Sequence, residues 1–170
     1  DLNGCNVDFA IGCTYKYLNG GPGSPAFIYV ARRHQGKASQ PLTGWWGHDA
    51  PFAFERDYRP AQNIRQMLSG TQGIISMAVA EVGVDIFLQA DMAQVRKKSQ
   101  ALTGLFIDLV DQRCAKYDFG LVSPRDPQRR ASQVSLDHQQ GYAIVQALIA
   151  RGVIGDFRAP TNMRFGFTPL

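Results

Sequence analysis

The 170-residue sequence predicts an α/β fold in two parts, the second of which is a small α+β unit. Short apolar runs of strand length occur together with longer runs of helical period, and this mixture is typical of the α/β class. Hydrophobic residues make up 45% of the chain and charged residues 19%, so the chain can bury a core. We place the boundary between the two parts at residue 90, which gives segments 1–90 and 91–170.

The first part begins with two predicted strands joined by a glycine-rich turn. Residues 7–12 and 26–31 are apolar runs of strand length. Glycine and proline then recur over residues 32–54, which predicts a loop without regular elements. The part ends with an apolar run over residues 74–90 that has the length of a helix.

The second part begins with the longest helical signal of the chain, over residues 91–114. Its apolar residues lie mostly three or four positions apart, as on the buried face of one helix: Val95, Leu102, Leu105, Phe106, Leu109 and Val110. Residues 132–137 alternate like a strand, and residues 142–149 predict an amphipathic helix ended by Gly152. Two further short strands are expected over residues 153–158 and 163–167.

Charge and cysteine content exclude several classes of partner. The formal net charge is +4, but the basic residues form three short clusters without zinc-finger spacing or an aromatic RNA-binding motif. The longest apolar stretch, residues 73–83, contains Glu81 and is too short to cross a bilayer. Three cysteines without metal-binding spacing indicate free thiols in a reducing compartment. We therefore expect a cytoplasmic protein that binds neither nucleic acid nor membrane.

The strongest chemical signal lies in the predicted turn of the first part. Lys16 stands between Tyr15 and Tyr17, where the first strand gives way to a glycine-rich sequence. Aromatic neighbours can desolvate an amine enough to leave it partly neutral near pH 7, and a neutral amine is the form that attacks carbonyl groups. A lysine before a turn is more often a solvated surface residue, so its position alone leaves both interpretations open.

Three further places contain groups that could bind an anion. Trp45 and Trp46 are either an aromatic plug on a loop or a source of indole N–H donors. Thr71 precedes a predicted helix, so its hydroxyl could cap that helix or contribute to a phosphate site at its N-terminus. Arg164 lies in an apolar strand, where its guanidinium needs either an internal carboxylate or a ligand carboxylate.

The histidines are interpreted as structural residues. His138 follows Asp137, but adjacent residues of a strand point to opposite faces, which argues against a catalytic pair of these two. His34 and His48 are expected to be loop residues, and we expect no metal site.

Together these motifs resemble the kynureninases, which are aminotransferase class V enzymes of pyridoxal-phosphate fold type I. Residues 8–23 resemble the cofactor-lysine segment of that family, and the Tyr-Lys-Tyr-Leu-Asn-Gly-Gly-Pro-Gly string at residues 15–23 is the most specific motif. The resemblance continues in order through residues 44–48, 69–71, 96–104 and 163–170. Cysteine desulfurases, the related class V enzymes, usually have histidine where this chain has Tyr15.

The resemblance implies how the two parts are used. Residues 1–90 would be the C-terminal part of the large pyridoxal-phosphate-binding domain, and residues 91–170 would be the interdomain helix and the small C-terminal domain of a fold-type-I transferase. The chain would then be a C-terminal segment of a longer homodimeric enzyme. Because the missing part would carry most of the cofactor pocket, we expect this segment alone to be inactive.

The implied activity is the hydrolytic Cβ–Cγ cleavage of L-kynurenine, or of 3-hydroxykynurenine, to anthranilate, or 3-hydroxyanthranilate, and L-alanine. This reaction belongs to tryptophan catabolism and the kynurenine pathway towards NAD biosynthesis. Two alternatives stay open: a cysteine desulfurase-like class V lyase, although no residue stands out as its persulfide cysteine, and a non-catalytic fragment or structural relative.

The resemblance also implies a role for each candidate residue. Lys16 would bind pyridoxal 5'-phosphate covalently and then move the Cα proton of the substrate. Tyr15 would contact the cofactor phosphate and could relay protons. Trp45, or alternatively Trp46, would bind the phosphate from the neighbouring subunit, and so would Thr71. Arg164 would hold the substrate carboxylate.

Overall fold

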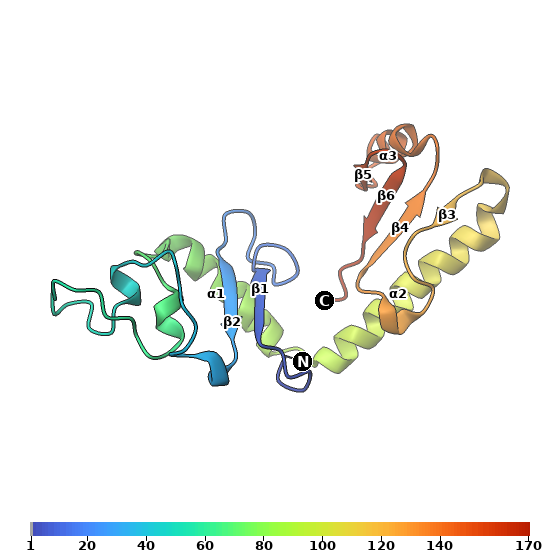
Figure 1. The fold of residues 1–170 in the computed structure, drawn as a ribbon. Coiled ribbons are helices and arrows are strands. Elements are labelled where there is room, and N and C mark those ends of the chain that lie inside the picture. Colours follow the sequence, from blue (N-terminus) through green and yellow to red (C-terminus); the bar gives the residue numbers. More distant parts are fainter. Residues whose placement is uncertain (1) are drawn as a thin grey trace. The chain divides into compact units, whose positions relative to one another are not determined.

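The computed structural model describes residues 2–170 and divides into two compact units, Asp1–Gln89 and Ala90–Leu170. Figure 1 shows that both units combine strands and helices. The mixed α/β fold predicted from the sequence is therefore confirmed. The assignment of the two segments to a large and a small domain of a transferase stays a prediction.

The first unit is built on a two-stranded antiparallel sheet of β1 (Phe9–Cys13) and β2 (Ala26–Val30). Phe9 lies opposite Val30, and Cys13 lies opposite Ala26, so the two strands form a hairpin whose long turn contains Lys16. The segment after β2 contains only single turns of 3₁₀ helix, in agreement with the predicted loop: η1 (Arg32–His34), η2 (Trp45–Gly47) and η3 (Ile64–Met67).

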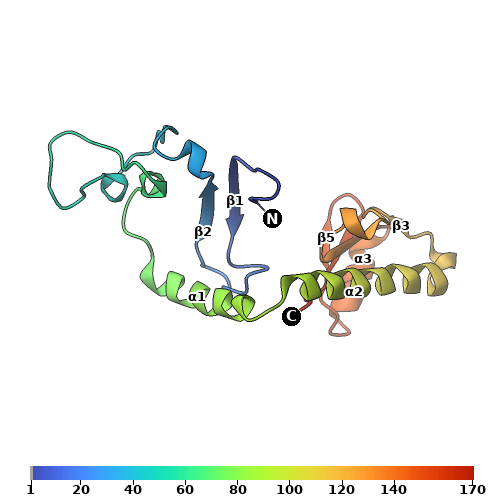
Figure 2. The same ribbon diagram turned by 90° about the horizontal axis from the view of Figure 1, so that it is seen from below.

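Helix α1 (Ile74–Leu88) ends the first unit. Figures 1 and 2 show it next to the turn that joins β1 to β2. Its buried positions are Ala80 and Gly83, and Gly83 lies against that turn. The other apolar residues of the helix are largely exposed, because the first unit covers only one side of it.

The second unit begins with helix α2 (Met92–Arg113), whose N-cap is Asp91. The Asp91 carboxylate accepts a hydrogen bond of 2.8 Å from the backbone N–H of Ala93, which satisfies a donor of the first turn. The unit continues with short elements, a helix and four strands: η4 (Ala115–Tyr117), β3 (Gly120–Leu121), η5 (Pro127–Arg129), β4 (Gln133–Asp137), α3 (Gly141–Ile149), β5 (Asp156–Arg158) and β6 (Asn162–Gly166).

These four strands form an antiparallel sheet in the order β3-β4-β6-β5. One face of the sheet is apolar and packs with residues of α2 and α3 in a buried core of Ile107, Val134, Leu136, Val145 and Met163. Since side chains alternate along a strand, the residues between them point to the other face. Ser135 therefore lies opposite Arg164 on the polar face, and Arg164 is not part of the apolar core.

Candidate active site

Lys16 lies in a turn that the backbone closes tightly. The N–H of Gly20 donates to the carbonyl of Thr14 at 2.9 Å, and the N–H of Asn19 donates to the carbonyl of Lys16 itself at 3.0 Å. At the base of the turn the hydroxyl of the buried Thr14 donates to the carbonyl of Pro25 at 2.6 Å. Lys16 therefore lies in a hydrogen-bonded turn and not at an open strand end.

Helix α1 braces this turn from one side. A Cβ atom added to Gly83 would lie closer than 3.0 Å to the carbonyl oxygen of Leu18 and 3.1 Å from the carbonyl carbon of Asn19. Only glycine allows the helix to approach the turn so closely. Beside this contact the ring of Tyr17 packs against Phe87, with their centroids 5.5 Å apart. Gly83 is therefore a positioning residue of the lysine turn, and the sequence alone gave no sign of this role.

The sequence left the surroundings of the Lys16 amine open, and the structure describes them. The Lys16 ammonium lies 5.1 Å from the centroid of the Tyr15 ring, which is a cation–π distance. Tyr17, by contrast, uses its ring to contact Phe87. Lys16 and both tyrosines are exposed in this chain, so the flanking rings do not bury the amine.

The tryptophan motif lies against the segment that contains Thr71. The backbone N–H of Trp46 donates to the carbonyl of Ser69 at 3.1 Å, and a Cβ atom on Gly44 would clash with the same residue. Two motifs that are separated by more than twenty positions are therefore adjacent in space. The tryptophan motif therefore lies next to Ser69, which is two positions before Thr71.

The two indole rings differ in their surroundings. Trp45 and Trp46 are stacked with centroids 4.5 Å apart, and Phe52 meets both rings edge-on. Trp45 is half-exposed, whereas Nε1 of Trp46 is buried and has no hydrogen-bond partner among the described residues. A buried donor without an acceptor is costly, and a phosphate oxygen would satisfy it. This observation fits a bound phosphate and favours Trp46 at least as much as Trp45.

Thr71 does not cap helix α1. The N-cap position is Gly73, and no side chain accepts a hydrogen bond from the first turn there. The hydroxyl of Ser76 donates to the Gly73 carbonyl at 2.8 Å. Of the two roles weighed for Thr71, helix capping is therefore wrong, and the exposed hydroxyl lies just ahead of a helix N-terminus, where an anion is favoured.

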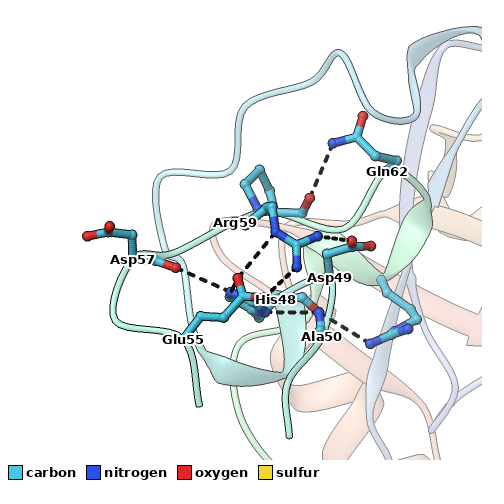
Figure 3. Close-up of polar contacts among 9 residues, drawn as sticks. His48, Asp49, Ala50, Glu55, Asp57, Arg59 and Gln62 are labelled. Atoms are coloured by element: carbon cyan, nitrogen blue, oxygen red, sulfur yellow. Dashed lines mark hydrogen bonds and ion pairs between the residues drawn. The ribbon is translucent and has the colours of Figure 1, made fainter. Parts of the chain in front are cut away.

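His48, next to the tryptophans, organises a loop (Figure 3). Its ring is buried, and Nδ1 accepts a 2.9 Å hydrogen bond from the N–H of Ala50. The neutral ring then carries its proton on Nε2, which lies 3.3 Å from the carbonyl of Asp57. Arg59 closes the same loop by donating to Glu55 at 2.8 Å, and this contact lowers the pKa of the Glu55 carboxyl. No group of three metal-ligating side chains occurs within residues 2–170.

Arg164, in the second unit, has an internal carboxylate partner. It lies directly opposite Asp156 across β5 and β6, and its Nε donates to Oδ2 of Asp156 at 2.9 Å. A second nitrogen of the guanidinium, Nη2, contacts the same oxygen. Of the two partners weighed for Arg164, the internal one is therefore present, and sequence reasoning missed Asp156.

His138 has a structural role. Its ring packs against Phe119 with centroids 5.0 Å apart, and its Nδ1 accepts a 3.0 Å hydrogen bond from the N–H of Gln140. It is thereby fixed at the end of β4 by its local chain.

Comparison with solved structures defines the class of fold. An apo cysteine desulfurase from Thermococcus onnurineus superposes with a TM-score of 0.76 at 14% identity, covering 98% of this chain and 43% of that one. A cystine C–S lyase superposes with a TM-score of 0.75 at 17% identity, covering 100% of this chain and 44% of that one. At these identities the likeness concerns the fold. It is the fold of the C-terminal part of class V pyridoxal-phosphate enzymes.

Sequence comparison is more specific. Residues 95–170 match the kynureninase C-terminal domain. The whole chain is 57% identical to a kynureninase of Burkholderia mallei and 56% identical to one of Pseudomonas fluorescens. Over its whole length the chain is similar to these kynureninases, and it spans 41% of the length of these curated relatives.

Proposed function

We propose that the full-length protein containing this chain is a kynureninase, a pyridoxal-phosphate-dependent hydrolase that cleaves the Cβ–Cγ bond of L-kynurenine or 3-hydroxykynurenine. The observation that carries this proposal is the closed turn around Lys16, within a chain 57% identical to kynureninases. The cysteine desulfurase alternative is supported by the fold alone, at 14–17% identity for the solved structures compared above.

The residues of this chain fit the phosphate group of such a cofactor. The indole N–H of Trp46 has no hydrogen-bond partner among the described residues and Thr71 is exposed, and both side chains have donors suited to an anion. When bound, pyridoxal phosphate supplies the electron sink for the substrate's Cα. One of the solved neighbours has glycine covalently linked to its PLP cofactor, which supports the same cofactor here.

Each candidate residue then has a defined role. The Lys16 amine binds the cofactor and afterwards takes and returns the Cα proton, while Tyr15 donates its phenol to the phosphate. The closed turn fixes the start of the lysine side chain, which reduces the orientational freedom that such a proton transfer must overcome. Arg164 holds the substrate carboxylate through its guanidinium.

The direct test is Lys16→Ala in the full-length protein. We expect loss of both kynurenine cleavage and visible cofactor absorbance, because no other amine of the turn replaces Lys16. Lys37→Ala is the matched control, since Lys37 is an exposed lysine of a loop in the same unit. Normal cleavage by Lys16→Ala would refute the assignment.

We further propose a homodimer in which Trp45 or Trp46 and Thr71 serve the neighbouring subunit's cofactor. Mixing Lys16→Ala subunits with Thr71→Ala subunits tests this arrangement. If sites are shared, one site of each mixed dimer is intact and activity returns above that of either variant alone. If all ligands come from one subunit, mixing restores nothing.

The cytoplasm is the proposed compartment. Cys5, Cys13 and Cys114 are free thiols, as is usual where thiols stay reduced. In residues 2–170 no helix has the length and apolar character needed to span a membrane.

A further inference from the structure

The polar face of the second unit's sheet holds a cluster of two arginines around one carboxylate. Asp156 on β5 contacts Arg164 on β6 through Oδ2, and Nη2 of Arg158 lies 3.3 Å from the same oxygen. Arg158 and Asp156 are two positions apart on one strand, so they share a face with Arg164. The cluster therefore carries a net charge of +1 and is accessible, with Arg164 33% and Asp156 44% exposed.

The contacts leave part of the Arg164 fork available. A guanidinium has five N–H donors, and Asp156 occupies one on Nε and one on Nη2. The remaining donors of Arg164, including both on Nη1, have no partner among the described residues. An arginine held along one edge in this way loses rotamer freedom before any ligand arrives.

We propose that Asp156 is a positioning residue: it holds the guanidinium of Arg164 so that the free donors bind a ligand carboxylate, while Arg158 offsets the charge of Asp156. This inference rests on the proposed function, in which Arg164 binds the carboxylate of the substrate. Arg164 can then have both an internal partner and a ligand, because one edge of its guanidinium contacts Asp156 and the other edge is available to the ligand.

Two effects of Asp156 on an anionic ligand oppose each other. Its own charge repels the ligand, which taken alone predicts tighter binding after Asp156→Asn. The carboxylate is half-exposed and already neutralised by two arginines, so solvent and salt screen that repulsion. Positioning is then the larger effect, and Asp156→Asn weakens binding.

The experiment measures kynurenine cleavage by the full-length enzyme and binding of L-alanine, the proposed product. We expect Asp156→Asn to raise KM for kynurenine about fivefold to tenfold, the effect of weakening one charge-assisted hydrogen bond, with kcat and cofactor absorbance nearly unchanged. Affinity for L-alanine should fall in parallel, whereas affinity for L-alaninamide, which lacks the carboxylate, should not.

Asp111→Asn is the matched control. Asp111 also binds an arginine of the same unit, Arg125, at 2.7 and 3.0 Å, and both side chains are exposed. We expect Asp111→Asn to change neither KM nor the alanine-to-alaninamide ratio. An equal rise of KM in both variants would show that only the stability of the second unit matters, and would overturn the proposal.

Arg164→Lys distinguishes the proposed role of Arg164 from the proposed positioning role of Asp156. If Asp156 acts through Arg164, the double variant with Asp156→Asn should have a KM no higher than that of Arg164→Lys alone. An unchanged KM in Arg164→Lys would refute the proposed role of Arg164 itself. A raised KM in Arg164→Lys with an unchanged or lowered KM in Asp156→Asn would refute only the positioning role.

Discussion

Substitution of Gly83 by alanine tests how helix α1 supports the turn that contains Lys16. The added methyl group would meet the backbone of Leu18, Asn19 and Gly20, with its closest approach below 3.0 Å. Backbone atoms cannot rotate away as a flexible side-chain end can. Either α1 or the lysine turn must move.

The expected magnitude combines two opposing effects. Overpacking of this kind costs about 1–3 kcal/mol, whereas replacing glycine by alanine inside a helix gains about 1 kcal/mol. Because the added methyl group would meet backbone atoms of the turn, we expect a cost of overpacking near the upper end of its range. The net loss of folding free energy for Gly83→Ala is then about 2 kcal/mol. The shifted turn should also weaken cofactor retention, since Lys16 lies two residues before Leu18.

Urea unfolding and visible cofactor absorbance of the full-length protein are the assays. Gly104→Ala is the matched control, because Gly104 lies inside α2 and a Cβ atom there meets no atom within 4 Å. We expect Gly104→Ala to stabilise the protein by about 0.5–1 kcal/mol with normal absorbance. If Gly83→Ala stabilises the protein as Gly104→Ala does, the contact between α1 and the turn does not brace the site.

Four further substitutions test the phosphate ligands and the surface charges. Tyr15→Phe removes the phenol and should weaken cofactor retention by about 1.5–3 kcal/mol, measured by dialysis against decreasing cofactor, if the phenol binds the phosphate. Trp46→Phe should weaken retention more than Trp45→Phe, because the buried N–H of Trp46 is the one without a partner among the described residues; the reverse order would assign the ligand to Trp45. Hydrogen bonding to Arg125 lowers the pKa of Asp111, so the pair stabilises the fold above the ordinary pKa of aspartate and this contribution is lost as pH falls through the lowered value. Asp111→Asn should accordingly show a shallower loss of stability on acidification than the parent, and an identical acid titration would contradict the ion pair.

The regular elements were predictable because their signals are local. The two hairpin strands and the helices α1 and α2 were found within a few residues of the observed bounds, since apolar spacing is set by the element's own period. The two-residue strand β3 was missed, because such a short segment has no periodicity of its own and is defined by its pairing with β4. Lys16, likewise, was noticed through the residues next to it.

The contacts that shape the site were not predictable, because they join distant parts of the chain. Nothing near Gly83 in the sequence indicates that the backbone of Leu18, more than sixty positions earlier, packs against it. The same holds for Trp46 and Ser69, whose hydrogen bond places two phosphate-ligand candidates in one region. The burial of Lys16 was also left open by the sequence, since flanking tyrosines do not indicate which other segments cover the amine.

Arg164 shows why a single charged residue in a strand leaves its partner undecided. The sequence allows an internal or an external carboxylate, and only the register of β5 against β6 reveals that Asp156 lies directly opposite. That register also places Arg158 on the same oxygen, so the internal carboxylate is shared between two cations and does not neutralise both. A fully paired arginine would have been structural. An arginine that is held along one edge, keeps unpaired N–H donors and lies in a cluster of net positive charge is suited to bind an anion. The internal partner Asp156 is therefore compatible with the proposed role of Arg164 as a ligand-binding residue.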